Sequence, residues 1–162
     1  MTKSPALTVL LSWSGLAFWL ILSFLPAWSG SRFPPGEWYA QLRQPPLTPP
    51  GWLFAPVWTV LYALMGLAAW LVWQRAGWLA AARPLALFLL QLLLNGLWSY
   101  LFFGLQRPGL ALLDLLSLWL VVLFTLRGFR LHHQTAGLLL VPYLLWLSFA
   151  AYLNLGFWLL NR

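Results

Sequence analysis

Residues 43–62 read RQPPLTPPGWLFAPVWTVLY, and this stretch decides the expected fold. Its first half contains four prolines, which are excluded from helix interiors because they lack an N–H group and their rings clash with the preceding turn: Pro45, Pro46, Pro49 and Pro50. The apolar run that follows has Pro56 one turn in, where proline is tolerated because the N–H groups there have no intrahelical partner. We therefore expect a stiff, extended loop over the mouth of a membrane helix that begins with Trp52, Phe54, Trp58 and Tyr62. A rigid lid over an aromatic-lined opening predicts a pocket.

Composition places nearly the whole chain in a membrane. Of 162 residues, 62% are hydrophobic and 7% are charged, whereas soluble domains carry about 25% charged residues. We expect one membrane domain over residues 1–162, with no second, soluble domain. The net charge of +7 comes from basic residues that are scattered singly beside apolar runs, which favours anionic membrane lipids as partners and not nucleic acid. Cysteine is absent, so disulfides, thiolate metal sites and cysteine catalysis are excluded.

Five apolar segments have about the 20 residues that a helix needs to cross the hydrocarbon core. They are residues 5–28, 52–73, 84–103, 109–126 and 136–160. They do not alternate as barrel strands would, so they predict an all-α, integral membrane bundle of five transmembrane helices. The first apolar run is too long for a cleaved signal peptide. Residues 29–51 form the one long connection, which we call the lid loop. Five basic residues on the N-terminal side against four on the other favour a cytoplasmic N-terminus.

Three predicted helices each carry a stripe of aromatic and polar side chains at helical spacing. The stripes contain Trp58, Thr59, Tyr62 and Gly66; Gln91, Asn95, Trp98 and Phe102; and Tyr143, Trp146, Ala150, Asn154 and Phe157. Single buried amides often connect membrane helices through hydrogen bonds. Three such stripes together favour a cavity lined by rings and a few hydrogen-bonding groups.

The opposite face of the third predicted helix carries small and apolar residues, namely Ala82, Ala86, Leu93 and Leu97. Small residues four apart allow helices to approach closely in lipid, so this face predicts a two-fold dimer interface, with plain lipid exposure as the alternative.

Acid–base and metal chemistry have few candidate residues. Asp114 is either structural, near a helix N-terminus and Arg107, or a site of proton coupling or ligand contact. His132 and His133 are expected in a solvated loop, with ligation of haem iron or another metal as the alternative. No catalytic set of residues can be assembled, so we expect no catalytic residue, no metal site and no required cofactor.

Three stretches that follow one another along the chain resemble the TspO/MBR family, the translocator or peripheral-type benzodiazepine receptor proteins. They are PPGEWYAQLRQPPLTPPGWLFAPVWTVLYALMG (34–66), QLLLNGLWSYLFFGLQRPGLALLDLL (91–116) and VPYLLWLSFAAYLNL (141–155). The resemblance implies a five-helix bundle, commonly a homodimer, with a pocket under the first loop for porphyrins, sterols and benzodiazepine-type ligands. It places Trp58, Tyr62, Asn95, Trp146, Ala150 and Asn154 at the pocket.

Together the stripes and the resemblance predict two sets of site residues. The ligand-binding set is Trp58, Tyr62, Gln91, Asn95, Trp98, Tyr143, Trp146, Ala150 and Asn154. The lid set is Trp38, Leu47, Pro49, Pro50 and Trp52. Two positions depart from the family: Leu47 stands where many members have an aromatic residue, and Leu155 stands where the sterol-linked pattern of animal members needs tyrosine.

These observations favour a membrane protein that binds tetrapyrroles and acts as a sensor, chaperone or regulator of tetrapyrrole traffic. Porphyrin or haem is then a ligand and not a cofactor. The alternatives are a transporter of porphyrin or another small hydrophobic ligand, and an enzyme that degrades porphyrin by light-driven oxidation. We expect a multi-pass integral membrane protein, in the cell membrane if it is bacterial.

Overall fold

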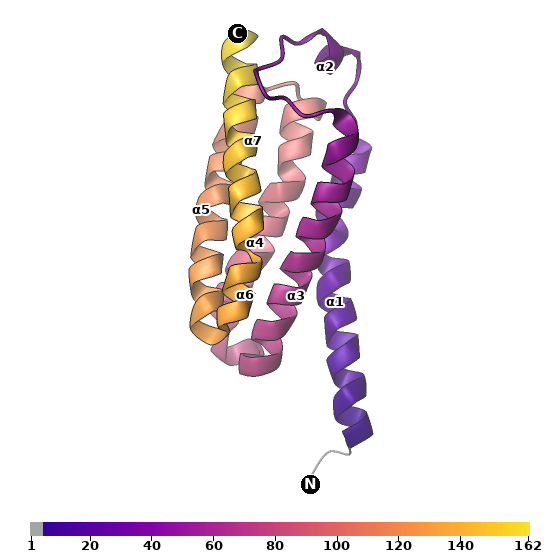
Figure 1. Ribbon diagram of the computed structural model, residues 1–162, viewed down its shortest axis with the longest axis vertical. Coiled ribbons are helices and arrows are strands. Elements are labelled where there is room, and N and C mark those ends of the chain that lie inside the picture. Colours follow the sequence, from indigo (N-terminus) through magenta and orange to yellow (C-terminus); the bar gives the residue numbers. More distant parts are fainter. Residues whose placement is uncertain (1–4) are drawn as a thin grey trace.

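Helices make up every regular element that the structure describes (Figure 1). The computed structural model describes the backbone of residues 5–162 and the side chains of residues 13–162. In order, the elements are α1 (Pro5–Arg32), α2 (Glu37–Gln41), the 3₁₀ turn η1 (Gly51–Leu53), α3 (Phe54–Ala80), α4 (Ala82–Ser99), the π-helical turn η2 (Tyr100–Gly104), α5 (Pro108–His132), α6 (Gln134–Leu139) and α7 (Val141–Leu160). Within these residues the fold is all-α, as predicted.

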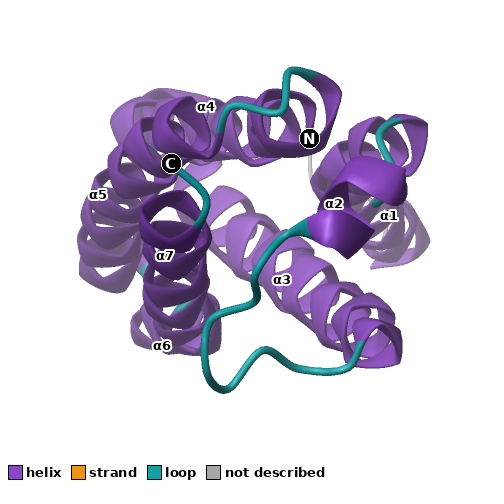
Figure 2. Cartoon of the chain, turned by 90° about the horizontal axis from the view of Figure 1, so that it is seen from above, coloured by secondary structure: helices purple, strands orange, loops and turns teal. Residues whose placement is uncertain are grey.

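Four helical stretches among the described residues are long and apolar enough to cross a membrane. They are Gly51–Ala80, Ala82–Gly104, Pro108–His132 and Gln134–Leu160. The helix α1 packs along α3 and α4, and α5 lies between α4 and α7. Seen from above, the lid loop and α2 cross one end of this bundle (Figure 2).

The helices run past several predicted ends. The helix α1 continues to Arg32 and α5 continues to His132. The helix α3 runs past its predicted end at Trp73, but Gly77, with a φ angle of 71°, breaks it before its last residue, Ala80. Polar and aromatic residues beyond the apolar core extend a helix in the interfacial region, where a search for apolar runs stops. One predicted helix, residues 136–160, is divided at Leu140 into α6 and α7.

The half of the bundle away from the lid loop is closely packed by large buried rings. Trp19, Phe88 and Phe129 are fully buried there, and the rings of Phe88 and Phe129 stack with their centroids 5.7 Å apart. The helices α1 and α3 cross closely, because a Cβ atom at Gly66 would lie 2.9 Å from the Cα atom of Leu20. This half therefore has little free space, and the cavity lies at the other end.

The two histidines lie at a helix junction and not in a free loop. His132 is the last residue of α5, and His133 caps α6 by accepting a hydrogen bond at its Nδ1 atom from the Ala136 N–H group at 3.4 Å. The predicted solvated pair is therefore replaced by a structural cap. Within the described residues, no group of three His, Cys, Asp or Glu side chains could hold a metal ion.

Candidate functional site

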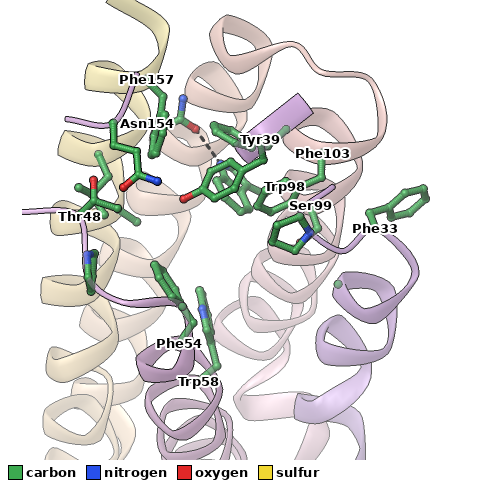
Figure 3. A pocket seen from close by; sticks show the side chains of 18 of the residues that line it. Phe33, Tyr39, Thr48, Phe54, Trp58, Trp98, Ser99, Phe103, Asn154 and Phe157 are labelled. Atoms are coloured by element: carbon green, nitrogen blue, oxygen red, sulfur yellow. Dashed lines mark hydrogen bonds between the residues drawn. The ribbon is translucent and has the colours of Figure 1, made fainter. Parts of the chain in front are cut away.

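A cavity of about 720 Å³ lies under the lid loop, within the range of about 300–1,000 Å³ that ligand pockets usually have. Its lining comes from the lid loop and from the lid-facing ends of α3, α4, η2 and α7. Figure 3 shows Tyr39 above the cavity, with Phe54 and Trp58 below it. The full lining is Gly30, Phe33, Pro35, Tyr39, Gln44, Thr48, Pro49, Pro50, Gly51, Phe54, Ala55, Trp58, Trp98, Ser99, Phe102, Phe103, Ala150, Leu153, Asn154 and Phe157.

The lid loop is fastened to α7 at several points. The side chain of Asn161 accepts a hydrogen bond from the Arg43 N–H group at 2.9 Å and donates one to the Arg43 carbonyl at 3.0 Å. The Tyr152 hydroxyl donates to the Pro46 carbonyl at 3.1 Å. Gly156 lets the loop approach closely, because a Cβ atom there would lie 2.5 Å from the Cβ atom of Pro45. The prolines that break helical structure thus form a roof with fixed attachment points.

Within the lid loop, α2 supplies the aromatic ring that hangs over the cavity. Tyr39 packs on Phe103 and Phe157, with both pairs of ring centroids 5.4 Å apart. Partial burial among these rings raises the pKa of the Tyr39 phenol above its ordinary range, so the side chain stays neutral at physiological pH. Neighbouring Trp38 contacts the ring of Phe102 from outside the cavity lining.

The π-helical turn η2 shapes one wall of the cavity. It ends α4 with hydrogen bonds from the Leu105 N–H group to the Tyr100 carbonyl at 2.7 Å and from the Arg107 N–H group to the Leu101 carbonyl at 3.0 Å. The wider turn changes the helical phase, so the adjacent Phe102 and Phe103 both line the cavity. Such turns inside longer helices often occur at functional sites.

A hydrogen-bonded chain sets the position of Trp98 on the wall. The Trp98 Nε1–H group donates to the Asn154 Oδ1 atom at 2.9 Å (Figure 3). The Asn154 Nδ2–H group donates in turn to the Pro108 carbonyl at 2.8 Å. The Trp98 ring also stacks on Phe102 at 5.0 Å. Asn154 therefore connects α4 to the beginning of α5 and holds an indole ring at the edge of the cavity.

Beneath the cavity, three buried polar side chains form a second chain. The Tyr62 hydroxyl donates to the Asn95 Oδ1 atom at 2.9 Å, and the Asn95 Nδ2–H group donates to the Tyr143 hydroxyl at 3.0 Å. Trp58 stacks on Tyr62 at 5.3 Å and so separates this network from the cavity. The network joins α3, α4 and α7 below the floor.

The predicted ligand-binding residues therefore fall into two layers. Trp58, Trp98, Ala150 and Asn154 line the cavity. Tyr62, Gln91, Asn95 and Tyr143 are buried beneath it, and Trp146 lies behind Phe54 with the two rings 5.9 Å apart. Gln91 reaches the Met65 sulfur atom at 3.7 Å. As direct ligand contacts, the residues of the second layer remain predictions.

Some of the predicted lid residues line the cavity, and others are exposed on the outside of the lid loop. Pro49 and Pro50 line the cavity, whereas Trp52 and Leu47 are 73% and 78% exposed. Leu47 has a φ angle of 65°, in the left-handed region, which directs the chain through the turn between the proline pairs.

The expected partners of Asp114 are absent. Both of its carboxylate oxygens are buried without a hydrogen-bond partner, and Arg107 is exposed. Asp114 is the seventh residue of α5, so it lies beyond the free N–H groups of the first turn and faces the bundle interior. The proposed dipole contact and ion pair with Arg107 are therefore wrong as explanations of this residue.

Several lining residues were not among the predicted site residues, notably Phe33, Tyr39, Phe54 and Phe103. Phe54 is four residues before Trp58 and lies on the same helical face, so its spacing could have revealed it. Phe103 joins Phe102 on the wall only through the π-helical turn, and Tyr39 depends on the path of the lid loop. Neither of these two features has a clear signal in the sequence.

The fold and the cavity define a multi-pass integral membrane protein with an aromatic-lined chamber at one end. The chain matches the TspO/MBR family over residues 15–159 and belongs to that family. It is 47% identical over 124 residues to the tryptophan-rich protein TspO of Archaeoglobus fulgidus, covering 76% of this chain and 80% of that protein. It is 41% identical over 140 residues to the tryptophan-rich sensory protein of Cereibacter sphaeroides, covering 83% of this chain and 87% of that protein. It is 42% identical over 134 residues to the translocator protein of Homo sapiens, covering 80% of this chain and 79% of that protein.

Proposed function

We propose that the chamber binds a tetrapyrrole of the porphyrin class and that the protein acts as a sensor, chaperone or regulator of tetrapyrrole traffic. The observation that carries this proposal is the ring of aromatic side chains around a cavity of about 720 Å³. Flat aromatic ligands gain offset-stacked and edge-on contacts from such walls. Family membership supports the same ligand class, and the names of two relatives, a sensory protein and a translocator protein, suggest roles in signalling or traffic.

Few polar side chains line the chamber. Thr48 of the lid loop and Ser99 of α4 have hydroxyl oxygens that can accept hydrogen bonds from a ligand, whereas the Asn154 amide is already bonded to Trp98 and to the Pro108 carbonyl. Arg32 at the end of α1 and Arg43 in the lid loop are exposed and lie outside the chamber lining, where their positive charges suit the carboxylates of a porphyrin that extends beyond the chamber. Sterols and benzodiazepine-type ligands, which the family resemblance implies, would use the apolar walls without these charges.

A titration with protoporphyrin tests the proposal, with quenching of tryptophan fluorescence as the readout. We expect saturable binding, and we expect Trp98→Ala to weaken it about tenfold because one indole wall is lost. Trp13→Ala is the matched control, since Trp13 is 66% exposed on α1 and lies outside the chamber. Equal effects of the two substitutions, or quenching that does not saturate, would contradict the proposal.

Light-driven oxidation of the bound porphyrin by dioxygen is the second candidate function. It is favoured by the two electron-rich indoles in the lining, Trp58 and Trp98. On illumination, porphyrin bound to the protein should then be degraded faster than free porphyrin in detergent. The substitution Trp58→Phe should lower this rate of degradation. Equal rates with and without the protein would exclude catalysis and leave binding intact.

Transport has less support than binding. A transporter usually places ionisable residues along its path, but Asp114 is absent from the chamber lining. Below the chamber the bundle is filled by buried side chains such as Met65, Phe88 and Phe129. Porphyrin flux into proteoliposomes that depends on the protein would support transport over binding alone.

We also propose that α1 is a fifth transmembrane helix. Its 28 residues would span about 42 Å, more than the roughly 30 Å of hydrocarbon, and it packs along α3 and α4. Tags at the two ends of the chain should then be accessible from opposite sides of the membrane. If both tags were accessible from the same side, the number of transmembrane helices would be even and α1 would not be a fifth one.

A homodimer is proposed through the outer face of α4. Ala82, Ala86, Leu93 and Leu97 are all exposed on this face, which leaves them free for a second copy. Ala86→Trp should shift the protein toward monomer in mild detergent and leave porphyrin binding intact. An unchanged dimer fraction would place the interface elsewhere.

A further inference from the structure

A hollow with positive charge lies at the end of the molecule opposite the lid loop. It has a volume of about 530 Å³ and is lined by Arg127, Arg130, Leu131 and Gln134. The two arginines are three residues apart on the last turns of α5, so they share one side of that helix. Gln134 begins α6 and adds an amide group. Figure 1 shows the junction of α5 and α6 at the end far from α2.

The arginines of this hollow have no carboxylate nearby in the chain. The protein has only two acidic residues. Glu37 begins α2 in the lid loop, at the opposite end. Asp114 lies thirteen positions before Arg127 on α5, a separation of about 20 Å along the helix. The Arg127 guanidinium lies over the ring of Phe124 at 6.0 Å, a contact that leaves its N–H donors open to an anion.

An apolar stripe on α5 leads to the hollow. Leu113, Leu116, Leu120 and Phe124 are each between 47% and 63% exposed. Their spacing of three or four residues keeps them on the same side of the helix as Arg127. From Leu113 to Phe124 the stripe is about 16 Å long, close to half of the roughly 30 Å hydrocarbon core.

We propose that this hollow and stripe form a specific site for an anionic phospholipid, which goes beyond the function proposed for the chamber. The phosphate lies between Arg127 and Arg130, where guanidinium groups make paired, charge-assisted hydrogen bonds. Gln134 donates to the headgroup, and one acyl chain lies along the stripe within a single leaflet. Charge and apolar area are thus arranged for one amphipathic molecule and not for a soluble anion.

Native mass spectrometry of the purified protein can test this site with phosphatidylglycerol and phosphatidylcholine of equal chain length. We expect tighter binding of phosphatidylglycerol, and we expect the double substitution Arg127→Gln with Arg130→Gln to reduce its affinity about thirtyfold. Arg75→Gln is the matched control, since Arg75 is exposed near the C-terminal end of α3 but does not line the hollow. Equal binding of the two lipids, or an equal loss in the control, would overturn the proposal.

The acyl contact distinguishes a lipid from a free phosphate. Phe124→Ser should lower the affinity for phosphatidylglycerol several-fold. Inorganic phosphate should compete with phosphatidylglycerol only at a far higher concentration. If phosphate competes as well as the lipid does and Phe124→Ser has no effect, the hollow is a soluble anion site and the lipid proposal fails. Unchanged protoporphyrin binding in every variant shows that the fold is retained.

Discussion

The two ends of the bundle use the same kind of side chain in opposite ways. Near the lid loop, Tyr39, Phe54 and Trp98 remain partly exposed and surround open space. At the far end, Trp19, Phe88 and Phe129 are fully buried and fill the space between helices. The difference arises from what lies opposite each ring, which is a proline-rich loop at one end and another helix at the other. A loop cannot interlock with helical ridges, so a chamber remains beneath it.

The largest expected effect concerns the packed end. Phe88→Ala removes a ring that contacts both Trp19 and Phe129, and we expect a loss of about 3 kcal/mol in the free energy of unfolding because a cavity remains. Protoporphyrin binding should be nearly unchanged in the fraction that stays folded. Thermal unfolding in detergent together with the fluorescence titration measures both effects.

The matched substitution at the chamber end is Phe54→Ala, which should reduce protoporphyrin affinity more than stability. If both substitutions lower stability by similar amounts and neither alters binding, the contrast between a packed end and an open end is wrong.

The second effect concerns the network between the two ends. Asn95→Leu leaves the Tyr62 and Tyr143 hydroxyls without their amide partner, and we expect a loss of about 2 kcal/mol because buried polar groups are then unpaired. The triple substitution Tyr62→Phe, Asn95→Leu and Tyr143→Phe should recover most of this loss, since no unpaired hydroxyl remains. Chemical denaturation of the variants gives these energies, and a triple variant less stable than Asn95→Leu would show that the network itself stabilises the bundle.

Features that repeat along a helix could be predicted from the sequence. The stripes through Trp58, Asn95 and Asn154 face the bundle interior as their spacing indicates, because helical periodicity is a local property. Thr59 is the exception, since it is exposed and its hydroxyl donates to the Ala55 carbonyl of its own helix. The prolines of the lid loop likewise predicted a stiff roof, since their geometry excludes a long helix.

Features that depend on how far a residue lies below the chamber, along the axis of the bundle, could not be predicted from the sequence. Spacing assigned Tyr143 and Asn154 to one stripe, yet Asn154 lines the chamber and Tyr143 is buried below it. The floor is set by the ring of Trp58 stacked over Tyr62, a contact that depends on how the helices tilt and cross. Asp114 shows the same limit, because its position near a helix start suggested partners that its inward direction prevents.

The third effect concerns the chamber wall. Asn154→Leu removes the acceptor of the Trp98 indole and the donor to the Pro108 carbonyl. We expect about tenfold weaker protoporphyrin binding because the indole is no longer held in place. Ser148→Ala is the control, since Ser148 accepts a similar bond from Trp119 at 2.9 Å but lies outside the chamber lining. Calorimetric titration compares the two, and an equal loss in Ser148→Ala would mean that the position of Trp98 is irrelevant.

The smallest effect concerns the roof. Leu47 has a φ angle of 65° and is 78% exposed, so it has backbone strain and little packing. Asparagine tolerates the left-handed region better than leucine does, and we expect Leu47→Asn to stabilise the lid loop by about 1 kcal/mol. Hydrogen exchange of the Arg43 amide, which is bonded to Asn161, should slow by about fivefold if the whole loop opens as a unit. Leu47→Ala keeps the Cβ atom and the strain, so its exchange rate should match the parent protein. Equal exchange rates in all three proteins would mean that the lid loop opens at a point other than Leu47. The prolines would then not make the loop equally stiff along its whole length.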